Sequence, residues 1–266
     1  MSSKFHTLLD RLPESLPDTM LRGAIVTIAL LPFSVIGTRL GLFDFRVGLL
    51  CFVLSAIAGV FIISVTAVAT RKQKEEQAKR KLSQAAVISA IPVVLVAMAV
   101  SKGSQAPPIH DITTDLNKPP QFQAAEDRRN IGENSLEIAP ATLSSQAKHY
   151  PELAGHKSSL AMHEALLVAA KTAESLNWKI YYINEQASVS QFEAVDTTLW
   201  FGFKDDIAVR LSQVDSGTMI DLRSASRVGR SDLGANAQRI KDYIQSYKAL
   251  EQQVTSRAAD ATETGS

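Results

Sequence analysis

Cysteine is almost absent from this sequence, and charges of opposite sign nearly cancel. The single cysteine, Cys51, excludes an intramolecular disulfide and a zinc site built from several cysteines. The 28 Lys and Arg residues balance 27 Asp and Glu residues, for a net charge of +1, which argues against a nucleic-acid partner. A Gly-x-Ser-x-Gly nucleophile motif is also missing. No motif in the sequence predicts a cofactor.

Charged residues are missing from three apolar stretches in the N-terminal part, 23–38, 47–70 and 82–101. A helix needs about 20 apolar residues to cross the hydrocarbon core of a membrane. The second and third stretches reach that length, and the first does so if its helix continues past Arg39 to Phe43. A buried helix of a soluble domain is the alternative for one such stretch, but three in succession favour a membrane region. No small-x-small cleavage site follows the first stretch, so we expect an anchor and not a signal peptide.

Basic residues are concentrated on one side of these stretches. The loop 71–81 holds six basic residues and the N-terminal stretch holds three, and both would lie on the same side of a membrane. The opposite side would have four: Arg39, Arg46, Lys102 and Lys118. Because cytoplasmic loops carry the excess of Lys and Arg, we predict a multi-pass protein of the bacterial inner (cytoplasmic) membrane with a periplasmic C-terminal domain. The expected organisation is a cytoplasmic N-terminus (1–22), a three-helix membrane region (23–101), an exported domain (102–252) and a disordered tail (253–266).

The exported part alternates between helical and extended patterns. Apolar residues recur at helical spacing from Met162 to Leu176 and from Leu233 to Tyr247. Ser158 or Ser159 is the expected N-cap of the first helix, and Ser231 or Asp232 that of the second. Four strands are expected between the helices, near 178–184, 188–201, 206–214 and 217–227, with a hairpin turn at Asp215-Ser216-Gly217. The predicted fold is an α+β domain: an antiparallel four-stranded sheet with two helices on one face. The segment 105–157, which is rich in proline up to Pro120, is then the candidate to cover the other face.

Side chains of opposite character alternate along the last two predicted strands. Apolar residues occupy every second position of the first of these strands: Ile207, Val209 and Leu211. The next strand repeats this with Ile220 and Leu222, and we call such a set of alternate positions one parity. Because successive side chains point to opposite faces, the apolar parity is expected to face the helices. The other parity places a polar cluster on the opposite face, formed by Arg210, Asp221, Arg223 and Arg227.

Three motifs resemble one known family. They are PPIHDITTD at 107–115, WFGFKDD at 200–206 and DLRSASRVGRSDLGANAQRI at 221–240. In this order they resemble the Domain of Unknown Function 1499 family, over about residues 105–250. Together with the preceding apolar stretches and Leu40–Arg46, they look like a membrane-anchored bacterial member. The resemblance implies no activity, because the family has none established.

Two functions are consistent with these residues. In the first, the exported domain is a non-catalytic module that binds an anionic small molecule, a lipid head group or an envelope protein through Arg223, Arg227 and Arg230. In the second, it is a hydrolase or lyase that uses His110 with Asp111 or Asp115. The expected partners are the lipid bilayer and one such ligand, without nucleic acid. The residues assigned to this site are His110, Asp111, Asp115, Arg223, Ser224, Ser226, Arg227, Arg230 and Asp232.

Structural roles compete with both functions. Asp111 and Asp115 would neutralise Arg223 or Arg227 where the covering segment lies on the sheet. The loop 229–234 has the outer glycine spacing of a phosphate loop but lacks its Lys-Ser/Thr pair. A helix N-terminus there could still hold an anion. A transporter role for the apolar stretches is less favoured, because none of them contains an Asp, Glu, Lys or His residue.

Overall fold

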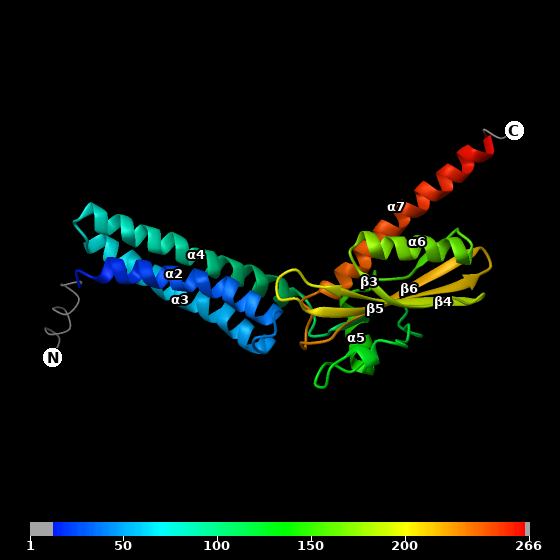
Figure 1. Ribbon diagram of the computed structural model, residues 1–266, viewed down its shortest axis with the longest axis horizontal. Coiled ribbons are helices and arrows are strands. Elements are labelled where there is room, and N and C mark those ends of the chain that lie inside the picture. Colours follow the sequence, from blue (N-terminus) through cyan, green and yellow to red (C-terminus); the bar gives the residue numbers. More distant parts are fainter. Residues whose placement is uncertain (1–12, 264–266) are drawn as a thin grey trace. The chain divides into compact units, whose positions relative to one another are not determined.

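The computed structural model describes residues 13–263 and divides into two units, with the boundary between Ser101 and Lys102. The first unit holds helices α2 (Leu16–Arg39), α3 (Phe45–Lys72) and the greater part of α4 (Glu76–Gln105) (Figure 1). All three are long and apolar enough to cross a membrane, as predicted. Large apolar side chains such as Phe61 and Val87 are 63% and 69% exposed. This outward apolar surface is typical of helices whose solvent is lipid.

Small residues let the three helices approach one another. Ala24, Ile62 and Ala85, one from each helix, form a buried cluster. A Cβ atom at Gly59 would lie 2.6 Å from the carbonyl oxygen of Ser89, so α3 and α4 pack closely there only because the residue is glycine. Asp18 and Lys81 form an ion pair of 2.7 Å between α2 and α4 near the beginning of both helices.

The second unit is built on an antiparallel sheet with six strands, and not four as predicted. The two additional strands are only three residues long and lie in the segment predicted to be a plain cover. A strand this short shows no alternation of period two, so the sequence pattern could not reveal it. Both pair with the same edge of β6, and the sheet order is β1-β6-β5-β4-β3 with β2 also on β6. The strands are β1 (Asp111–Thr113), β2 (His156–Ser158), β3 (Lys179–Asn184), β4 (Val189–Thr197), β5 (Lys204–Val214) and β6 (Gly217–Ser226).

Helices α6 (Met162–Ser175) and α7 (Ala235–Glu263) pack on one face of this sheet (Figure 1). Their apolar stripes join Ile207, Val209 and Leu211 of β5 in one core cluster, so the predicted parity is confirmed. Trp178 and Tyr243 stack in this core with ring centroids 5.0 Å apart. The other face carries the segment between β1 and β2, with the 3-10 turn η1 (Glu126–Arg128) and helix α5 (Pro140–His149).

Several element ends differ from the predictions. Helix α6 begins after Ala161 without a side-chain cap, because Ser158 and Ser159 bind Glu251 instead. Leu233 precedes α7 with φ 55° and is 51% exposed, so it does not belong to the apolar stripe. The helix also continues through 253–263, where a disordered tail was predicted. Three of these residues are alanine, the strongest helix former (Ala258, Ala259 and Ala261).

Candidate functional site

Arg223 of β6 lies on the sheet face that is covered by the segment between β1 and β2, and it is only 1% exposed. Its Nε and Nη2 atoms donate to the two carboxylate oxygens of Asp111, at 3.0 and 2.8 Å. Its Nη1 donates to the carbonyl of Pro120, and its guanidinium lies 4.8 Å from the ring centroid of Phe122. Arg223 therefore joins β6 to β1 and to the covering segment. Each of its nitrogens already has a protein acceptor.

Arg227, the residue directly after β6, pairs with Asp206 of β5. Its Nε and Nη2 donate to the two oxygens of Asp206 at 3.1 and 2.8 Å. Arg129 of the covering segment donates to the same carboxylate at 2.9 Å, and Asp206 is fully buried. The hydroxyl of Tyr181 lies 3.3 Å from Asp206. Burial and the nearby carboxylates of Asp206 and Glu193 raise the pKa of Tyr181, so its hydroxyl stays protonated and donates.

Arg210 joins two carboxylates on the same face. Its Nη2 lies 2.9 Å from both Asp115 and Asp221. Burial raises the pKa of Asp115, but backbone N–H groups of Lys118 and Asn117 and the Arg210 guanidinium outweigh it, so the net shift is downward. The covered face is thus a set of internal ion pairs, in which the covering segment supplies Asp111, Asp115 and Arg129.

The contacts support a structural role for Asp111 and Asp115, as charges that neutralise arginines of the sheet. Asp111 does neutralise Arg223, whereas Asp115 pairs with Arg210 and Arg227 pairs with Asp206. No contact tests whether Arg223 and Arg227 also bind a ligand, and that role stays a prediction. Any anion that reached them would have to displace carboxylates that are already in place.

Ser224 and Ser226 lie on the helix face, away from these arginines. Ser224 donates to Asn236 of α7 at 2.7 Å, and Asn236 donates to the hydroxyl of Ser226 at 2.9 Å. Next to them Arg239 of α7 pairs with Asp196 of β4 and Asp205 of β5, at 2.8 and 2.5 Å. The two ion pairs of Arg239 were not predicted from the sequence. One signal was available: Asp205 shares the apolar parity of Ile207, and a carboxylate facing a helix requires a cation there.

The side chain of Asp232 occupies the N-terminus of α7. The carboxylate of Asp232 accepts from the backbone N–H groups of Gly234 and Asn236 at 2.8 and 2.9 Å. Asp232 thus caps the helix, as one of the two predicted candidates, and it fills the position where an external anion would bind. Arg230 beside it is exposed.

His110 makes its hydrogen bonds through its backbone carbonyl, which accepts from Ser226 and Asn236. Among the residues that the structure describes, no carboxylate lies within hydrogen-bond distance of its ring. The histidines at 149, 156 and 163 each contact a different partner: Ser145, Glu251 and Glu185. Within residues 13–263 no group of three or more His, Cys, Asp or Glu side chains has an arrangement that could hold a metal ion.

A second polar cluster joins β2 to α7. Glu251 accepts from the hydroxyl of Ser158 at 2.6 Å and lies 2.8 Å from the ring nitrogen of His156. Tyr247 donates to Ser158 at 3.0 Å. Burial raises the pKa of Glu251, but hydrogen bonds from Ser158, His156 and the backbone of Ser159 lower it further than burial raises it. The partners lie far apart in sequence, so no local pattern could have revealed them.

The lowered pKa of Glu251 predicts a loss of stability in acid. A carboxyl group with a lower pKa in the folded state stabilises the fold above its unfolded pKa, near 4.5, and this contribution disappears as the pH falls through the folded pKa. We expect Glu251→Gln to lower the urea midpoint at pH 7 and to converge with wild type below pH ~4. Equal differences between the two proteins at pH 7 and pH 3 would contradict this prediction.

A pocket of about 350 Å³ lies on the helix face, where α6 ends and α7 begins. Leu176 and Trp178 supply its apolar wall, and Asp196, Gln238 and Asp242 supply polar atoms. Arg239 is its cation, and its nitrogens all donate to Asp196, Asp205, Asn236 and Ser224. Asp196 and Asp242 each keep one carboxylate oxygen without a hydrogen bond from a described residue. The pocket therefore has two carboxylate oxygens that can accept a hydrogen bond from a ligand, whereas every guanidinium nitrogen of Arg239 already donates within the protein.

One known family matches most of the second unit. The family model described as "Protein of unknown function (DUF1499)" matches residues 111–246, which is just over half of the chain. The match begins at β1 and ends within α7, so it covers both sheet faces and the pocket. No curated protein and no solved structure matches the chain.

Proposed function

Because the chain belongs to the DUF1499 family, whose members have no known function, we propose a role from its geometry: a membrane-anchored, non-catalytic recognition domain. The ligand we propose carries a primary ammonium group, as in an amine-bearing lipid head group. The pocket between α6, β4 and α7 is the site. The observation that carries this proposal is the surplus of carboxylate oxygens beside the wall formed by Trp178.

The size and chemistry of the pocket agree with a small ligand. Its volume, about 350 Å³, lies within the usual range for ligand pockets. Asp196 is 27% exposed at its side chain and Asp242 is exposed at the surface of α7, so both can reach a ligand. Ammonium groups donate up to three hydrogen bonds and accept none, which complements an acceptor-rich site. This ligand differs from the anionic one that the arginine pattern predicted.

The hydrolase or lyase alternative has no comparable support. Asp111 and Asp115 are bound to Arg223 and Arg210, and the His110 ring has no carboxylate partner among the described residues. The His110 ring thus lacks the carboxylate that orients the histidine base of a catalytic triad. We therefore favour recognition over catalysis.

The proposed location follows from the distribution of basic residues. We propose that α2, α3 and α4 span the bacterial inner membrane, with the basic segment 71–81 in the cytoplasm and the domain in the periplasm. We expect an alkaline phosphatase fused after Ser266 to be active and a cytosolic fluorescent reporter at the same position to stay dark. The reverse result would place the domain in the cytoplasm.

Binding is tested with short-chain lipids of equal acyl length. We expect full-length protein in detergent to bind dihexanoyl phosphatidylethanolamine more tightly than dihexanoyl phosphatidylcholine in calorimetric titration, because only the former has N–H donors. Asp242→Asn should weaken the former about tenfold, by loss of a charge-assisted hydrogen bond. Asp215→Asn, in the exposed β5–β6 turn, is the matched control and should bind like wild type.

Free ethanolamine distinguishes the two sources of the ammonium group. If it competes at concentrations similar to those of the lipid, the ligand is a small amine and not a head group. Equal binding of the two lipids, or unchanged binding by Asp242→Asn, would refute the proposed site.

A further inference from the structure

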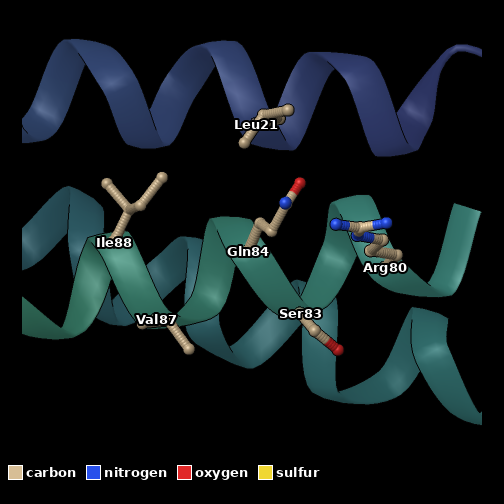
Figure 2. A pocket seen from close by; sticks show the side chains of 6 residues that line it. All are labelled: Leu21, Arg80, Ser83, Gln84, Val87 and Ile88. Carbon is tan, nitrogen blue, oxygen red and sulfur yellow. The ribbon is translucent and has the colours of Figure 1, made fainter.

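A groove lies between α2 and α4, within the first unit and near the beginning of both helices. It has a volume of about 480 Å³ and is lined by six residues. Figure 2 shows Gln84 and Ile88 pointing from α4 toward α2, which carries Leu21, and Arg80 on α4 one turn before Gln84. The three residues on α4 are four positions apart, so they form one stripe about 12 Å long. The complete lining is Leu21, Arg80, Ser83, Gln84, Val87 and Ile88.

This stripe changes from charged to apolar along the helix. Arg80 belongs to the basic segment 71–81, which includes the first turns of α4, whereas Ile88 lies well inside the charge-free stretch 82–101. The ion pair between Asp18 and Lys81 lies beside Arg80 in sequence and marks the level where charged groups are tolerated. A polar end at the membrane surface and an apolar end in its core match the amphiphilic profile of a phospholipid.

Arg80 differs from its basic neighbours in having no acidic partner. Lys79 pairs with Glu76 and Lys81 pairs with Asp18, both at 2.7 Å. Within residues 13–263 no carboxylate lies within ion-pair distance of Arg80. Its guanidinium, exposed at the mouth of the groove, is therefore free to bind an anion.

Gln84, one helical turn further into the apolar stretch, also lacks a partner for its polar side chain within the described part of the chain. Its carboxamide is exposed from the helix surface and has no hydrogen-bond partner among the described residues. A polar group without a partner is costly next to hydrocarbon. An ester carbonyl of a lipid, which lies just below the phosphate, would accept a hydrogen bond from it.

We propose that this groove binds one anionic phospholipid from the leaflet on the side of the loop 71–81. Arg80 binds its phosphate, Gln84 donates to an ester carbonyl, and one acyl chain lies along Leu21, Val87 and Ile88. This site is separate from the domain pocket and rests only on α2 and α4 lying in a bilayer.

Native mass spectrometry of the full-length protein in detergent tests this site. We expect wild type to retain one phosphatidylglycerol under conditions that remove phosphatidylcholine of the same chain length. Arg80→Gln should weaken phosphatidylglycerol binding roughly tenfold, because a charge-assisted contact is lost. Lys74→Gln removes one charge from the same loop outside the groove, and its binding should stay close to wild type. Gln84→Leu changes no charge and should also reduce retention.

Each other outcome overturns the site. Equal losses in Arg80→Gln and Lys74→Gln would mean general attraction to a basic surface. Displacement of the lipid by inorganic phosphate would mean an anion site without lipid specificity. Circular dichroism checks that the variants are helical, and if Arg80→Gln is not, wild-type retention by Gln84→Leu overturns the proposal.

Discussion

Arg223→Ala is expected to destabilise the C-terminal domain strongly, and not merely to remove a contact for a ligand. The substitution leaves Asp111 buried, with 5% exposure and without its cation. It also removes the link between β6 and the covering segment at Pro120 and Phe122. Breaking one partner of a buried ion pair costs about 3–5 kcal/mol. This is a large share of a total stability of about 5–15 kcal/mol for a domain.

Urea unfolding of the full-length protein, followed by the fluorescence of buried Trp178, measures this effect. Arg230→Ala is the matched control, because Arg230 is exposed and its loss should change stability by less than about 0.5 kcal/mol. The double variant Asp111→Leu with Arg223→Met removes both charges and should be less destabilised than Arg223→Ala alone. A wild-type midpoint for Arg223→Ala would show that the ion pair is dispensable and would restore a binding role for the cluster.

Asp206→Ala is expected to be comparably destabilising, because it deprives two arginines of their shared carboxylate. Arg129 and Arg227 both donate to Asp206, and the side chains of these arginines are 7% and 8% exposed. We expect a loss of about 3–5 kcal/mol in the same unfolding experiment. Asp206→Asn keeps the shape and should fall between Asp206→Ala and wild type.

Asp215→Ala is the control for a surface carboxylate and should unfold like wild type, since Asp215 lies in the exposed turn after β5. If Asp206→Ala retained full stability, the two arginines would have to find other acceptors. That outcome would contradict the structural role that we assign to the covered face.

Elements with a sustained pattern were predictable from the sequence, and elements without one were not. The three apolar helices and the parity of β5 and β6 follow from runs of many residues that agree with one another. Strands β1 and β2 have three residues each and exist because β6 presents an edge to them. Such pairing is decided by tertiary contacts, which a local pattern does not contain.

The polar residues show the same division. Parity placed Arg210, Asp221, Arg223 and Arg227 on one face, and the structure has them there. Asp206, which pairs with Arg227, and Arg129, which donates to the same carboxylate, were not foreseen, because pairing depends on where the covering segment crosses the sheet. The pocket residues Asp196 and Arg239 come from β4 and α7, 43 positions apart, and no motif joins them.

The pairing of β1 with β6 sets an order of events during folding. Asp111 pairs in register with Ala225, so the first strand of the domain must wait for the last one to be synthesised. Contacts between residues so distant in sequence slow folding, because a long loop has to close first. Until β6 pairs with β1, the carboxylate of Asp111 remains solvated and is not paired with Arg223. We therefore expect the sheet edge to be completed, and both charges to be neutralised, late in folding.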